Sequence, residues 1–279
     1  MVIIMERRVG TVSRGIRCPI IKEGDDLATI VTNCVTEASR CEGFDLKDRD
    51  VVAMTESIVA RAQGNIVSID DIAADVKAKT GGETVGVIFP ILSRNRFAVC
   101  LKGIAKGVKK VIIMLSYPTD EVGNRLVTDE MIEAAGINPY SDVLDLKRYR
   151  EAFGSYKHEF TGVDYVDIYT DIVRESGAEV EFVFANHAKA ILDYTDCVIS
   201  CDIHTRERNK RILRENGAKV VLGMDDIMSA PIGNSGYNEK YGLLGSNKAT
   251  EDTGKLFPRN GQPVVDTIQK IIYEATGKQ

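Results

Sequence analysis

The sequence predicts a mixed α/β fold, with a mixed α+β N-terminal part and a C-terminal part built on a mostly parallel sheet. The main observation is that short apolar runs alternate with amphipathic helical patterns through the last third of the chain. The length, 279 residues, is enough to bury a core without disulfides. Because no apolar run reaches ~18 residues, the sequence predicts no membrane span and no membrane partner.

The composition narrows the class of protein. Hydrophobic residues make up 44% and charged residues 28%, which is typical of globular domains. The net charge of −5 disfavours nucleic acid as a partner. The six cysteines form no CxxC motif, so we expect free thiols in a reducing cytoplasm. Residues 1–5 are apolar and precede charged residues, which indicates a first strand rather than a signal peptide.

The first 116 residues are expected to contain further strands and three helices. Apolar residues recur three and four positions apart in the helical segments, and Asp25 or Asp26 can cap the first of them. Ser68 and Asp71 indicate the start of the second. The predicted helices span 26–41, 68–79 and 97–109, and the predicted strands span 50–55, 85–89 and 110–116.

A polar, loop-rich segment from 117 to 162 contains two short helical patterns, at 128–135 and 145–153. We therefore predict three parts: 1–125, then 126–162 as a boundary or inserted lobe, then 163–279. In the last part the predicted helices span 164–176, 205–215 and 263–275, and the strands span 179–185, 196–201 and 219–222. Gly177 and Gly217 stand where helix C-caps are expected.

Polar side chains follow several of these strands. Asp202 and His204 follow the strand 196–201, and Asn186 with His187 follows 179–185. Since ligands bind at the carboxyl ends of parallel strands, such groups suit a site for Mg²⁺ or Mn²⁺. Asp and Asn also turn chains and cap helices, and we favour that interpretation for Asp225 and Asp226. Both interpretations stay open for residues 202–204.

Common nucleotide motifs are missing from the chain. It has no GxxxxGK[ST] and no GxGxxG after a strand, so a dinucleotide oxidoreductase is suggested only by the predicted fold. A polar, Gly-rich segment at 241–259 can present backbone N–H groups to phosphate, or it is simply a loop. The basic residues of 206–214 indicate a solvated helix face, although Arg206 or Lys210 can instead hold an anion.

Two motifs are more specific. Residues 15–27 read G-I-R-C-P-I-I-K-E-G-D-D-L, and residues 48–64 read D-R-D-V-V-A-M-T-E-S-I-V-A-R-A-Q-G. Together they resemble the coenzyme F420-0:γ-glutamyl ligase family over about residues 10–125. The resemblance implies a homodimer that adds L-glutamate to a carboxylate-bearing coenzyme through an acyl phosphate, using GTP and Mg²⁺ or Mn²⁺. The small-molecule substrates would then be GTP, L-glutamate and the coenzyme acceptor.

The resemblance also implies roles for individual residues. Arg61 stands where the family more often has Lys, and it would bind phosphate and stabilise an oxyanion. Asp120 would bind metal within Asp120–Asn124. Asp202 would supply a second carboxylate, or residues 184–187 would stand in its place without a carboxylate. His204 or His187 is a candidate general base, because an imidazole can accept a proton near neutral pH. By the resemblance, the nucleotide would contact Pro19, Ile20, Ile21, Lys22, Glu56, Ser57, Arg61 and Asn124. Gly245, Ser246 and Asn247, in the Gly-rich segment, are added as candidates for its phosphates on composition alone.

The second half departs from the family pattern, because the S-D-T-x-G-R-P-W-R motif is absent and Ile199–Arg206 is its nearest echo. This difference leaves two alternatives beside the F420-0 ligase. One is a ligase that glutamylates another acceptor, such as a folate. The other is a nucleotide-binding module of the same fold without ligase activity.

Overall fold

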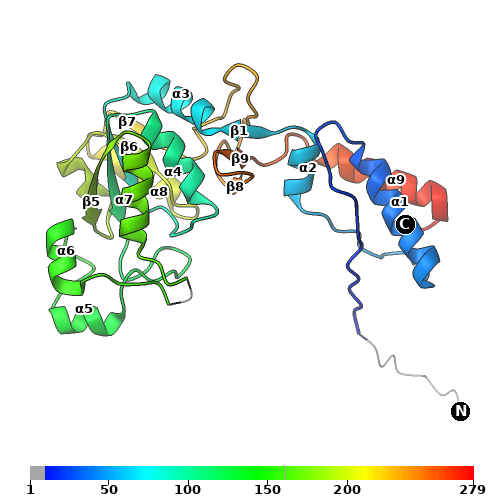
Figure 1. Cartoon of the computed structure of the whole chain (residues 1–279), viewed down its shortest axis with the longest axis horizontal. Coiled ribbons are helices and arrows are strands. Elements are labelled where there is room, and N and C mark those ends of the chain that lie inside the picture. The colour runs from blue at the N-terminus through cyan, green and yellow to red at the C-terminus, as the bar shows by residue number, and fades with distance from the viewer. Residues whose placement is uncertain (1–9, 160) are drawn as a thin grey trace, which may run out of the picture.

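The computed structural model describes residues 10–159 and 161–279 (Figure 1). The strand predicted at 1–5 lies outside the described residues. The larger of two lobes contains a six-stranded sheet with the order β4-β5-β3-β2-β6-β7, in which every pairing is parallel except that of β4 with β5. The strands are β2 (Thr84–Ile88), β3 (Lys110–Leu115), β4 (Leu144–Asp145), β5 (Glu179–Phe184), β6 (Cys197–Ser200) and β7 (Val220–Gly223). The predicted α/β class is confirmed.

Helices cover both faces of this sheet. On one face lie α3 (Ile69–Thr80), α4 (Phe97–Lys106) and α7 (Tyr165–Glu175), and on the other lie η1 (Ala188–Asp193) and α8 (Arg206–Glu215). Alternate residues of one strand enter different cores: Ile113 packs on the α4 side, and Ile112 and Met114 pack on the η1 side. This two-sided burial explains why the strand is an unbroken apolar run.

The strand order creates a switch point between β2 and β6. From β2 the chain crosses through α4 to β3, whereas the strand on the other side of β2 is β6, whose following helix α8 covers the opposite face. The loops after β2 and β6 therefore diverge. In open α/β sheets, such a divergence leaves a crevice at the carboxyl ends of the strands.

The segment from 117 to 162 packs on the edge of the same sheet. It contains α5 (Asp129–Ala135) and α6 (Leu146–Phe153), and β4 extends the sheet beside β5. The ring of Tyr149 stacks on Phe184 with 3.8 Å between centroids, and its hydroxyl donates to the Leu126 carbonyl. The segment thus shares its apolar core with the predicted 163–279 part.

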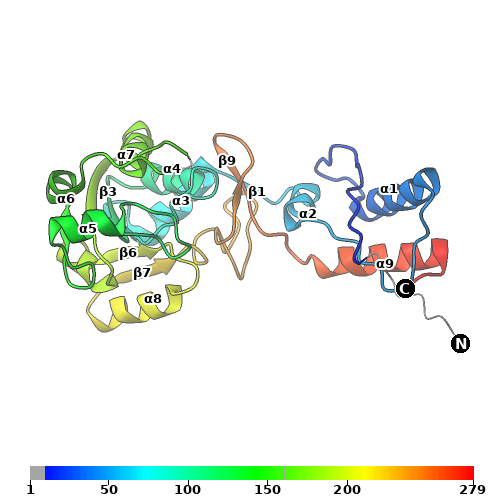
Figure 2. The same ribbon diagram turned by 90° about the horizontal axis from the view of Figure 1, so that it is seen from below.

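The smaller lobe is helical and combines both ends of the chain. It consists of α1 (Leu27–Glu42), α2 (Glu56–Ala62) and α9 (Gln262–Thr276). Figure 2 shows α1 and α9 side by side, and Leu27, Val31 and Ile268 are buried in their shared core. The Asp26 carboxylate accepts from Thr29 N and caps α1, as one of the two predicted alternatives.

Two chain segments join the lobes, and they are hydrogen-bonded to each other. Gln63 and Arg259 exchange two hydrogen bonds, of 2.6 and 2.9 Å, and the buried Asn65 amide donates to the Phe257 carbonyl. Beyond them lies a three-stranded sheet of β1 (Ile66–Ser68), β9 (Thr253–Lys255) and β8 (Asn247–Lys248). Strands of two or three residues are too short to show a period, so the sequence did not predict them.

One predicted element is wrong. Residues 50–55 form no strand in the structure, and the Val51 side chain is 88% exposed. The residues have strand-like composition, but no described strand pairs with them, and a strand is stable only when its backbone groups are paired. The helices predicted at 26–41, 68–79 and 164–176 are confirmed within about two residues, which is the usual uncertainty of helix ends.

The six cysteines are all free, as predicted. Over residues 10–159 and 161–279, the structure contains no helix that is both long enough and apolar enough to cross a bilayer.

A buried ion pair on α7 provides a pH test of the fold. The Asp164 side chain is 6% exposed, caps α7 through Val166 N, and accepts from Arg150 at 2.6 Å. Burial raises the pKa of this carboxyl, but hydrogen bonds from Arg150 and Ser155 outweigh burial and hold the pKa below its usual value. The stabilisation is therefore fully present above the ordinary Asp pKa and is lost as pH falls through the lower folded pKa.

We expect Asp164→Asn to lower the free energy of unfolding by about 2 kcal/mol at neutral pH, because Arg150 loses the buried one of its two carboxylate partners and keeps only the exposed Asp167. Urea unfolding between pH 7 and pH 2 should show the gap between wild type and variant closing below about pH 4. Asp129→Asn, which alters the exposed pair with Arg125, is the matched control and should change much less. A gap that persists unchanged at pH 2 would contradict this account.

Candidate functional site

The candidate site is a cavity of about 220 Å³ at the switch point of the large sheet. It lies between the loop from β2 to α4, the carboxyl ends of β6 and β7, the loop 243–247 and the first residue of α2. We call it the crevice. Its polar lining consists of the side chains of Glu56, Arg96, Ser246 and Asn247. The position agrees with the general rule for ligand sites in parallel sheets.

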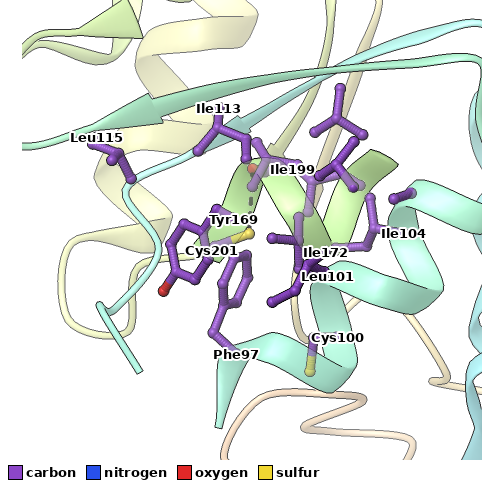
Figure 3. Close-up of a cluster of buried hydrophobic side chains, with 14 of the residues drawn as sticks. Phe97, Cys100, Leu101, Ile104, Ile113, Leu115, Tyr169, Ile172, Ile199 and Cys201 are labelled. Carbon is purple, nitrogen blue, oxygen red and sulfur yellow. Dashed lines mark hydrogen bonds between the residues drawn. The ribbon is translucent and has the colours of Figure 1, made fainter. Parts of the chain in front are cut away.

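The wall of the crevice is apolar and includes two thiols. Cys100 and Cys201 lie near the carboxyl ends of the strands, among the buried residues in Figure 3. Burial raises the pKa of Cys100 to about 11 and raises the pKa of Cys201 well above its usual value. Both groups are therefore neutral thiols and serve as packing groups rather than nucleophiles.

Tyr169 holds the loop that forms one side of the crevice. Its hydroxyl accepts from Ser93 N and donates to the Ile91 carbonyl, both at 3.1 Å. Its ring meets Phe97 edge-on, with 5.6 Å between centroids, as Figure 3 shows. Ser93 Oγ in turn accepts from Arg96 N at 3.2 Å. A buried phenol on α7 thus fixes the backbone from which Arg96 projects.

Asp120 organises the loop after β3. Its buried carboxylate accepts four hydrogen bonds: from Leu92 N at 2.9 Å, Val122 N at 3.0 Å, Asn124 N at 2.9 Å and Asn124 Nδ2 at 2.7 Å. A carboxylate has about four lone-pair positions, so these donors use all of them. Asp120 therefore ties the loop after β3 to the loop after β2.

The next residue extends this connection across the sheet. The Glu121 carboxylate accepts from the backbone N–H groups of Ile203 and His204, the second at 3.0 Å. These residues follow β6, and β6 is separated from β3 by β2. The loop after β3 thus crosses the carboxyl end of β2 and is joined to the loop after β6.

Asp202 has its own network. Its carboxylate is 1% exposed and accepts from Ser200 Oγ, from Thr205 Oγ1 at 2.6 Å and from Asn209 Nδ2 at 3.0 Å. Asp120 and Asp202, the predicted metal ligands, are each occupied by donors of the protein. In the described residues no three His, Cys, Asp or Glu side chains gather where they could bind a metal. In this arrangement the residues do not fit a metal centre.

Most of the residues predicted to bind nucleotide lie on α2 or beside one of its two ends. Glu56 begins the helix and lines the crevice together with Gly245, Ser246 and Asn247. At the other end, Gly24 N donates to the Ala62 carbonyl at 2.9 Å, which places the loop after Pro19–Lys22 beside the end of α2. Ser57 and Arg61 lie between the two ends. Asn124 is held by Asp120 in a separate loop.

The predicted cations and imidazoles near α8 have different surroundings. Arg206 pairs with Asp225 at 3.1 Å and donates to the Ile203 carbonyl, and the buried Lys210 pairs with Asp226 at 2.7 Å. Both cations are therefore neutralised by carboxylates of the protein. His204, the predicted general base, is an exposed residue whose backbone N–H is bound to Glu121.

Sequence reasoning missed Arg96 and Tyr169. Arg96 precedes a predicted helix after a predicted strand, so the rule about strand ends pointed to its loop. The sequence prediction instead selected the carboxylates that follow other strands, such as Asp202. Tyr169 lies within the predicted helix 164–176, and nothing in the sequence indicates that its hydroxyl contacts a loop 76 residues away.

Comparison of the sequence with known protein families identifies one family that matches this chain. The model of the F420-0:gamma-glutamyl ligase family matches residues 15–279. The coenzyme F420:L-glutamate ligase of Methanothermobacter thermautotrophicus is 35% identical over 68 residues, which cover 23% of this chain and 25% of the relative. That of Methanosarcina mazei is 34% identical over 85 residues, or 29% and 30%. The chain thus matches less than a third of these relatives' length. No solved structure gives a significant match.

The hydrogen bonds of Asp120 predict the effect of removing its carboxylate. We expect Asp120→Ala to lower the free energy of unfolding by about 2–4 kcal/mol, because buried donors lose their acceptor. The measurement is urea unfolding in EDTA, with Asp129→Ala, an exposed carboxylate a few residues away, as the control that should change little. A metal ligand without a structural role would show the opposite pattern: unchanged stability in EDTA and loss only of metal-dependent stabilisation.

Proposed function

Because the chain belongs to the F420-0:gamma-glutamyl ligase family, we propose that it is an amide-forming ligase that joins L-glutamate to the carboxylate of a coenzyme, F420-0 or a related molecule. The observation that carries this proposal is the family match over residues 15–279, which includes both lobes and the crevice. We also propose GTP as the energy source, on the resemblance of residues 15–27 and 48–64 to the family motifs.

The proposed chemistry proceeds in two steps. A carboxylate is a poor acyl donor, so its oxygen first attacks the γ-phosphorus of GTP, which releases GDP and forms an acyl phosphate. The amine of L-glutamate then attacks the acyl carbon, phosphate leaves, and the amine loses a proton. Charge develops on phosphoryl and acyl oxygens in both steps, and fixed cations near them lower the barrier. We propose Arg61, which lies at the end of α2 away from the crevice, as a cation that binds the nucleotide rather than the reacting oxygens, and His204 as the acceptor of the proton.

The arrangement along α2 supports a site for an extended nucleotide. The helix has seven residues, or about 10 Å of rise. One of its ends lies beside the loop after Pro19–Lys22, which the family resemblance assigns to the guanine-nucleotide site, and the other end lines the crevice. We propose that the nucleotide lies along α2, with its base near Lys22 and its phosphates toward Gly245–Asn247.

A divalent ion is proposed to arrive with the nucleotide. Mg²⁺ is commonly held by one or two carboxylates together with substrate phosphates, rather than by protein alone. Asp120 and Asp202 would have to release some of their present donors to take part. We therefore assign no step to the metal.

We propose a homodimer formed through the helical lobe. Exposed large hydrophobic side chains are concentrated there and in the segments beside it, and they include Val12, Ile20, Val51, Val52, Val265 and Tyr273. A cavity of about 400 Å³ lies between α1, α9 and residues 46–54, and a second of about 460 Å³ lies between residues 12–21, α1 and residues 44–58. Gathered apolar exposure of this kind is typical of interaction surfaces.

One observation favours a second candidate, a nucleotide-binding module without ligase activity. The predicted metal carboxylates are engaged in the network of the fold, as residues that have lost a catalytic role would be. A folate-type γ-glutamyl ligase is a variant of the first candidate, in which only the acceptor differs.

The test combines binding and turnover. We expect calorimetry to show GTP bound more tightly than ATP, with Mn²⁺ or Mg²⁺ increasing the affinity. GTP hydrolysis should require both L-glutamate and a carboxylate acceptor, and labelled glutamate should enter the product. Arg61→Gln should reduce GTP affinity, whereas Arg174→Gln, on the exposed surface of α7, should not. Tight GTP binding without glutamate-dependent turnover would favour the non-catalytic module, and no nucleotide binding would overturn both candidates.

A further inference from the structure

The crevice contains a single cationic side chain. Among its lining residues, all of which lie in the described part of the chain, only Arg96 carries a positive charge. The guanidinium is exposed, and no ion pair or side-chain hydrogen bond engages it within residues 10–159 and 161–279. The cations of α8 differ in this respect, because Arg206 and Lys210 are paired with aspartates.

The crevice needs a cation if phosphates are to enter it. Glu56 lines the same cavity and presents a carboxylate to it. Two like charges about 4 Å apart repel by roughly 4 kcal/mol at the effective dielectric of a protein surface. Arg61 lies toward the far end of α2, near the loop 19–24. Arg96 is therefore the group in the crevice that can offset Glu56.

The size of the crevice indicates which part of a nucleotide it can hold. Its volume of about 220 Å³ is below the roughly 300–1,000 Å³ of sites that enclose whole cofactor-sized ligands. Ser246 and Asn247 supply polar side chains beside Arg96, in a Gly-containing loop. These features suit a terminal polyphosphate group better than a base or a complete nucleotide.

We propose that Arg96 binds the terminal phosphates of the nucleoside triphosphate and thereby makes the crevice specific for a triphosphate. This inference rests on the proposed function, because it takes nucleotide binding along α2 as given. A guanidinium can donate two parallel hydrogen bonds to phosphate, which makes it selective for the oxygen-rich end of the ligand.

The backbone of Arg96 is fixed before any ligand binds. Arg96 N donates to Ser93 Oγ, Ser93 N donates to Tyr169 Oη, and Tyr169 is buried on α7. Leu92 N, in the same loop, donates to Asp120. Because the backbone N–H groups of Leu92, Ser93 and Arg96 are each held, the loop loses little entropy on binding, and more of the Arg96–phosphate interaction contributes to affinity.

The experiment compares Arg96→Gln, Arg96→Lys and a matched control, Arg94→Gln, in the full chain. Arg94 is an exposed arginine of the same loop that does not line the crevice. Calorimetry with GTP, GDP, GMP and inorganic triphosphate is done in Mg²⁺ buffer. We expect Arg96→Gln to weaken GTP and inorganic triphosphate by about 10- to 100-fold and GMP by less than threefold. Arg96→Lys should lose less, and Arg94→Gln should match wild type.

Several outcomes would overturn the inference. If wild type binds GTP but Arg96→Gln and Arg94→Gln lose equal affinity, the crevice arginine has no specific role, while the proposed function stands. If Arg96→Gln weakens GTP, GDP and GMP equally, or lowers thermal stability, its role is structural. If wild type binds neither GTP nor inorganic triphosphate, the proposed nucleotide site and the role of Arg96 both fail.

Discussion

The burial of β2 and β3 on both faces is the constraint on which the rest of the large lobe depends. A strand whose two faces are both apolar must have helices packed on both faces of the sheet. Accordingly, α4 and α7 pack on one face and η1 and α8 pack on the other. Once helices leave neighbouring strands toward opposite faces, the loops at the strand ends separate. The crevice between β2 and β6 is thus a consequence of how the core is covered.

Carboxylates at this edge of the sheet serve first as acceptors for backbone N–H groups. Asp120 and Glu121 bind amides from the loops after β2 and β6, and Asp202 gathers the hydroxyls and amide around the start of α8. Loops at strand ends leave many N–H groups unpaired, and a buried unpaired donor is costly. The same residue types would suit a divalent cation, so their chemistry alone does not distinguish the two uses.

The helical lobe contributes to the site through one short helix. α2 is the helix of this lobe that leads directly into one of the two joining segments, and hydrogen bonds between Gln63 and Arg259 hold that segment beside the returning chain. A ligand along α2 would therefore contact both lobes. Burial of the apolar surface that is exposed around α1 and α9 would favour binding of the proposed second copy of the chain there.

The sequence by itself determined the α/β class, the positions of the long helices and five of the six strands of the large sheet, all but β4, since these depend on period, caps and composition. The family followed from two local motifs. Only the tertiary structure decided how distant groups are used. It left 50–55 unpaired although its residues favour a strand, and it engaged the carboxylates of Asp120 and Asp202 with backbone and side-chain donors. It also brought Glu56, Arg96 and Ser246 to one cavity. Those outcomes depend on contacts between segments far apart in the sequence, and a local sequence pattern does not specify which distant segment it will contact.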